Sequence, residues 1–157
     1  MRYLPLILLV AVLATLAAIA AGAARADDAG VATSVKKRSL RISPRAATLG
    51  TVISPRTSST KALVSLQSFT KVARQGAAAI ATTKPSTKNG AKLKLLAKRA
   101  FVNVGDAGAL LVKAVQMVRA GKSEVDVTIT VNQAVKLANN GSIQLKNATT
   151  LLHKIAG

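Results

Sequence analysis

Small aliphatic residues recur at alternating spacings of four and three along residues 93–118. This alternation places them on one face of an α-helix of about seven turns. Half of the 157 residues are hydrophobic but only 2% are aromatic, which suits closely packed helices better than a sandwich or barrel. We therefore predict an all-α fold around this stripe, which comprises Leu93, Ala97, Ala100, Val104, Ala107, Leu111, Ala114 and Val118.

A similar stripe precedes it from about residue 59. Ser58 or Ser59 is suited to cap the start of this helix, and Lys84-Pro85 should stop it. Gly121 is placed to end the second helix as a C-terminal cap. The apolar residues of the first stripe are Ala62, Leu66, Phe69, Ala73, Gly76 and Ile80.

The third segment fits two patterns. Residues 125–131 alternate like a strand, and Asn140-Gly141 resembles the turn of a hairpin over 135–145. A helical seam nevertheless continues to the end of the chain, and a hairpin has no reason to keep helical phase across its turn. We favour a helix, begun by Ser123 with Asp126 three residues on, and kinked near 139–141. Its seam is Val127, Val131, Ala134, Ala138, Gly141, Leu145, Ala148, Leu152 and Ile155.

These patterns predict an antiparallel three-helix bundle over residues 59–157. Residues 27–58 show no apolar stripe that we recognise, and contain Gly, Ser, Thr, Pro and six basic residues. We expect a flexible basic linker there. The tetrapeptide Ile-Ser-Pro-Arg occurs in it twice, at 42–45 and 53–56, and could instead be a docking or processing motif.

Residues 1–26 have the organisation of a secretory signal peptide. Arg2 supplies the positive start, an apolar run follows, and Ala24-Arg25-Ala26 is a small-x-small cleavage signal. We expect cleavage after Ala26 and a secreted, periplasmic or cell-envelope location. The alternative is a retained membrane anchor, because the uncharged stretch 3–24 is long enough to cross a bilayer.

The composition provides few side chains that are suited to catalysis. The chain has no Cys and a single histidine, His153, and the acids of the predicted bundle are Asp106, Glu124 and Asp126. A helix from Ser123 onward would separate Glu124 from His153 by about 40 Å. We therefore predict no enzyme activity, no metal site and no cofactor.

The excess of positive charge is the sequence feature that most clearly indicates a function. The chain carries 23 Lys and Arg against 5 Asp and Glu, a net charge of +18. Cations near the start of a helix are disfavoured by its macrodipole, so we expect an external anion at this end of the bundle. A solvated face that merely keeps the protein soluble is the alternative. The candidate anion-binding residues are Lys84, Lys88, Lys92, Lys94, Lys98 and Arg99.

The expected function is therefore non-catalytic binding of a polyanionic polymer or an anionic membrane surface. Phe69 lies on a seam and Phe101 beside one, which argues against single-stranded nucleic acid because bases stack on exposed aromatic side chains. The alternatives are a helical structural or protein-interaction module, with self-association through small residues on the third helix, and a membrane-anchored form.

Overall fold

The computed structural model describes residues 28–52 and 58–156, and these form four packed helices. The helices are α2 (Ala29–Val52), α3 (Ser59–Ala81), α4 (Lys88–Arg119) and α5 (Glu124–Ala156). The predicted signal peptide, its cleavage site and the second Ile-Ser-Pro-Arg lie outside the described residues.

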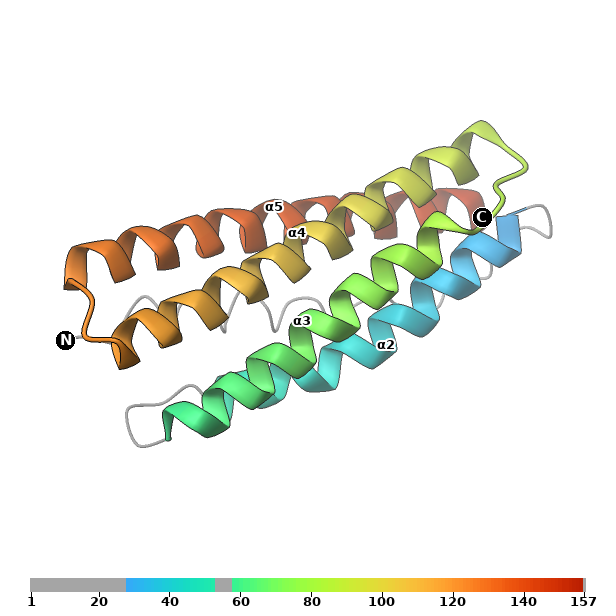
Figure 1. The fold of residues 1–157 in the computed structure, drawn as a ribbon. Coiled ribbons are helices and arrows are strands. Elements are labelled where there is room, and N and C mark those ends of the chain that lie inside the picture. The colour runs from blue at the N-terminus through green and yellow to red at the C-terminus, as the bar shows by residue number, and fades with distance from the viewer. Residues whose placement is uncertain (1–27, 53–57, 157) are drawn as a thin grey trace.

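The helices run alternately up and down, and each packs against the next one along the chain (Figure 1). α4 is central: it lies between α3 and α5 and also contacts α2. The start of α2, the connection 82–87 and the end of α5 gather at one end, here called the 82–87 end. The turn 120–123 between α4 and α5 lies at the opposite end, the 120–123 end.

The fourth helix corrects our prediction for residues 27–58. Instead of a flexible linker, 29–52 form α2, which packs mainly on α3. An apolar face does exist there, but Ser39 occupies one of its buried positions, where its hydroxyl donates to the carbonyl of Val35 at 3.0 Å. Pro44 is tolerated within the helix on its exposed side. The apolar residues buried along α2 are Val31, Ala32, Val35, Ile42, Ala46 and Leu49.

The predicted seams of α3 and α4 form the core, with one exception. Every seam residue of α3 is buried, and so is every seam residue of α4 except Val118, which is 58% exposed near the end of that helix. By length and composition α4 is apolar enough to span a bilayer. The core helix of a bundle can pass the same test, and α4 packs against the three other described helices.

Residues 124–156 are one continuous helix, so the hairpin alternative for 125–145 is wrong. The small residues Ala134, Ala138, Gly141 and Ala148 are buried, as α5 packs on α4. At Gly141, a β-carbon would lie 2.8 Å from Val104 and 3.1 Å from the carbonyl oxygen of Ala100. These small residues are thus used within the chain, which removes the reason for proposing self-association through them.

The predicted helix ends are present. The hydroxyl of Ser58 accepts a hydrogen bond from the N–H of Lys61 at the start of α3, and that of Ser123 accepts from the N–H of Asp126 at the start of α5. Gly121 has a φ of 65°, and the N–H of Lys122 donates to the carbonyl of Met117. This pattern is a Schellman motif, in which a residue in the left-handed backbone conformation ends the helix.

Candidate anion-binding site

The start of α4 is built around the carboxylate of Asp28, the residue just before α2. Asp28 accepts hydrogen bonds from the backbone N–H groups of Ser86 at 3.1 Å and Thr87 at 3.4 Å, and from the Thr87 hydroxyl. Thr87 is the N-cap of α4, and its hydroxyl oxygen accepts from the N–H of Gly90 at 3.0 Å. A β-carbon at Gly90 would overlap the Asp28 carboxylate, so only glycine fits there.

The hydrogen bond from the Thr87 hydroxyl lowers the pKa of the Asp28 carboxyl. Burial opposes this effect, and the N–H groups of Ser86, Thr87 and Gly90 reinforce it. A negative charge is favoured at a helix N-terminus, because the N–H groups there are unpaired and the macrodipole is positive. The protein thus supplies its own anion at this position. The macrodipole of α4 therefore no longer supports an external anion, and anion binding by the six basic residues stays a prediction.

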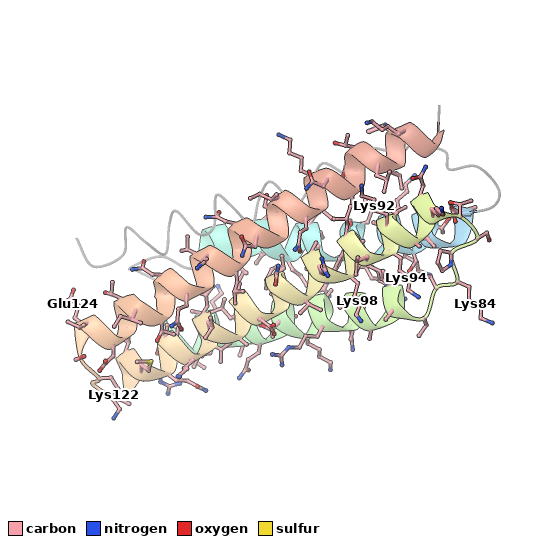
Figure 2. The ribbon with its side chains drawn as sticks, turned by 90° about the horizontal axis from the view of Figure 1, so that it is seen from above. Lys84, Lys92, Lys94, Lys98, Lys122 and Glu124 are labelled. Carbon is pink, nitrogen blue, oxygen red and sulfur yellow. The ribbon has the colours of Figure 1, made fainter. Side chains whose placement is uncertain are left out.

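The six predicted basic residues do not form a single patch. Lys84 lies in the connection before α4, and the other five follow along the first half of α4. Figure 2 shows Lys92 on the side of α4 that faces α5, and Lys94 and Lys98 on the side that faces α3.

Lys94 differs from the other five because its ammonium has a partner. It is half-buried, and its Nζ donates to the carbonyl oxygen of Thr83 at 2.5 Å, just beyond the end of α3. A cation is favoured there, since the last carbonyls of a helix are unpaired and carry partial negative charge. Lys94 therefore stabilises the α3–α4 connection.

The other five cations are exposed, and none has a hydrogen-bond or ion-pair partner within 28–52 and 58–156. Lys88, Lys92 and Arg99 share one stripe of α4 by their spacing, with Leu95 between them 46% exposed. The outer side of α4 at the 82–87 end therefore combines cations with exposed aliphatic groups. The five unpaired residues, called the basic end below, are Lys84, Lys88, Lys92, Lys98 and Arg99.

Sequence reasoning missed a basic residue from α5 that joins this region. Because α5 returns antiparallel to α4, Lys154 in its last turn comes to the same end as Lys92. The two lysines line an open pocket between the helices. The antiparallel prediction already contained this signal, since it places the end of the third predicted helix beside the start of the second.

The described acids all have local roles or lie away from the basic end. Asp106 pairs with Arg74 at 3.3 Å, the one ion pair in the described part of the chain, and the Asp126 carboxylate accepts from the Ser123 hydroxyl. Glu124 begins α5 at the 120–123 end, whereas His153 is exposed in the last turn of that helix. Among the described residues no three His, Asp or Glu side chains come together as a metal site.

Comparison with known proteins adds no assignment: no family model matches the chain, nor does any curated protein or solved structure.

Proposed function

We propose that this protein is an exported, non-catalytic protein that binds polyanionic polymers or anionic membrane surfaces of the cell envelope through its basic end. The observation that carries the proposal is the set of five exposed cations without a described partner at one end of a helical bundle. Unpaired cations bind multivalent anions through many weak, salt-sensitive contacts.

Export rests on the signal-like residues 1–26. Sequencing the N-terminus of the secreted or envelope-associated protein tests this part. A chain that begins at Asp27 supports cleavage after Ala26. A chain that still begins at Met1 supports the membrane-anchored alternative and contradicts the proposed processing.

Retention on immobilised heparin tests the basic end. A variant with Lys84, Lys88, Lys98 and Arg99 changed to Gln keeps Lys94, which holds the α3–α4 connection, and also keeps the α4–α5 pocket. We expect it to elute at clearly lower salt than the parent, because it makes fewer ionic contacts with heparin. Exposed contacts of this kind are screened over a Debye length of about 10 Å at 0.1 M salt.

The matched control removes the same charge from elsewhere on the molecule. It changes four exposed cations near the 120–123 end and along α5 to Gln: Lys113, Arg119, Lys122 and Lys136. We expect a smaller shift in elution for this control. Equal shifts would mean that net charge alone governs retention, and would overturn the assignment of binding to the basic end.

A second candidate function, protein interaction, is favoured by a different observation. Val118, Val125 and Ile129 lie near the 120–123 end and are 58%, 68% and 51% exposed. Exposed aliphatic groups close together are typical of contact surfaces. Light scattering of the parent and of a V125S/I129S variant tests this function: assembly by the parent alone supports it, and a monomeric parent argues against self-association.

A further inference from the structure

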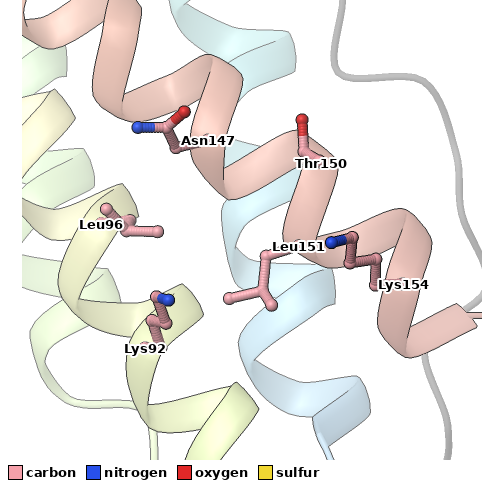
Figure 3. Close-up of a pocket in the computed structure, with 6 residues that line it drawn as sticks. All are labelled: Lys92, Leu96, Asn147, Thr150, Leu151 and Lys154. Atoms are coloured by element: carbon pink, nitrogen blue, oxygen red, sulfur yellow. The ribbon is translucent and has the colours of Figure 1, made fainter.

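The pocket between α4 and α5 lies at the 82–87 end, beside the outer face of α4. It has a volume of about 260 Å³ and is formed by residues of two antiparallel helices (Figure 3). Lys92 and Leu96 come from α4, and the α5 residues that line it are Asn147, Thr150, Leu151 and Lys154.

The electrostatics of the pocket favour an anion. Figure 3 shows Lys92 and Lys154 on opposite sides of the space between the helices, each with its nitrogen turned toward that space. No carboxylate lines the pocket, and neither ammonium has a hydrogen-bond or ion-pair partner in the part of the chain that the structure describes. Two like charges that face one space repel each other, and an anion bound between them adds attractions that outweigh this repulsion.

The polar groups of the pocket narrow the choice of anion. The side-chain amide of Asn147 makes no hydrogen bond within the described residues and is free to donate to an anionic oxygen. The hydroxyl of Thr150 already donates to the carbonyl of Lys146 at 3.1 Å. The two ammonium groups thus provide charged donors for a tetrahedral oxyanion such as a phosphate.

The pocket also has an aliphatic floor. Leu96 and Leu151 are half-buried and pack against the core, and their remaining surface lines the pocket. A volume of 260 Å³ is below the range of about 300–1,000 Å³ typical of pockets that enclose a whole small molecule. The pocket therefore suits one phosphate and the first carbons of an attached chain.

We propose that this pocket binds the phosphate group of an amphiphilic phosphate ester, with the phosphate between Lys92 and Lys154 and the alkyl chain on Leu96 and Leu151. This inference deepens the proposed function, because it names a defined ligand class beside a surface proposed to bind polyanions. The apolar floor favours a lipid-like ester over the sugar–phosphate backbone of a polymer.

Calorimetric titration of the full chain with hexyl phosphate, inorganic phosphate and hexanol tests the proposal. Hexyl phosphate should bind about tenfold or more tightly than inorganic phosphate, because each buried methylene adds hydrophobic stabilisation. Hexanol should not bind measurably. Equal affinity for inorganic and hexyl phosphate would show a free-phosphate site and overturn the amphiphile assignment.

Charge variants locate the binding. A K92Q/K154Q variant should bind hexyl phosphate about tenfold or more weakly, since both contacts to the phosphate lose their charge. A K88Q/K98Q variant, with the same change in net charge, should lose less than about threefold, because exposed charges outside the pocket are screened by salt. Equal losses in the two variants would contradict a defined pocket.

The outcome is separable from that of the heparin experiment. The Lys84, Lys88, Lys98 and Arg99 variant retains both pocket lysines, so it should still bind hexyl phosphate. If that variant and the parent elute alike from heparin while hexyl phosphate binds, the pocket stands and polyanion binding by the basic end fails. If heparin retention depends on the basic end and hexyl phosphate does not bind, polyanion binding by the basic end stands and the proposed phosphate-ester pocket fails.

Discussion

Asp28 shows how one residue can join two distant parts of a chain. It precedes α2, yet its carboxylate accepts hydrogen bonds from Ser86 and Thr87 at the start of α4. The sequence marks Asp28 only as part of an acidic pair after the predicted cleavage site. Its partner follows from the antiparallel return of α3, which brings residue 87 beside residue 28.

Replacing Asp28 with Asn should lower the free energy of unfolding at neutral pH and make that free energy less dependent on pH. The Thr87 hydroxyl lowers the pKa of Asp28 in the folded state. Its stabilising effect is therefore full above the unfolded-state pKa of about 4, and is lost as the pH falls through the lower folded-state pKa. Urea unfolding at a series of pH values from neutral to strongly acidic measures this.

The difference in stability between parent and D28N should shrink on acidification. Glu124→Gln is the control, because Glu124 is an exposed acid at the opposite end and its replacement changes the net charge equally. A parent and D28N that differ by the same amount at every pH would contradict the assigned role of the Asp28 charge.

At the scale of helices, regular periodicity was sufficient for α3, α4 and α5. In each of them apolar residues keep a four–three spacing, so burial on one face follows from the helix geometry itself. In α2 the same face is interrupted by Ser39, and Pro44 suggests a break. The Ser39 hydroxyl donates to a carbonyl of its own helix, and Pro44 lies on the exposed side. Packing on α3 therefore stabilises a helix that the composition of this segment does not indicate.

Two substitutions on α2 test whether it belongs to the core. Ile42 is 1% exposed and lies beside Ala100, Phe101 and Val104 of α4, whereas Leu40, two residues earlier, is 64% exposed. Ile42→Ala should cost about 2–5 kcal/mol of unfolding free energy. Leu40→Ala should cost less than about 0.5 kcal/mol.

Urea unfolding monitored by circular dichroism measures both values. Equally small effects for the two substitutions would mean that residues 29–52 behave as the flexible linker that composition alone predicts.

The whole molecule carries a charge that its packing does not neutralise. A net charge of +18 is accompanied by a single ion pair, Arg74–Asp106, in the described residues. Mutual repulsion of the cations opposes the compact state. Stability of the bundle and binding of polyanions should therefore respond to salt in opposite directions.

Raising the salt concentration from about 0.02 to about 0.5 M should increase the melting temperature, because the Debye length shortens and the repulsion is screened. Thermal unfolding followed by circular dichroism measures this. The variant with Lys84, Lys88, Lys98 and Arg99 changed to Gln should start from a higher melting temperature at low salt and gain less from added salt. A melting temperature that falls with salt would show that attractive pairs dominate.

The helical class, the seams of α3 to α5, the caps at Ser58, Gly121 and Ser123 and the excess of positive charge could all be predicted from the amino-acid sequence. These properties depend on residues within a few turns of one another, so spacing along the chain reveals them. Only the tertiary structure shows that α2 joins the core, that Asp28 supplies the anion at α4 and that Lys94 binds the Thr83 carbonyl. Each of those contacts depends on which helices become neighbours, and the periodicity of a single helix does not contain that information.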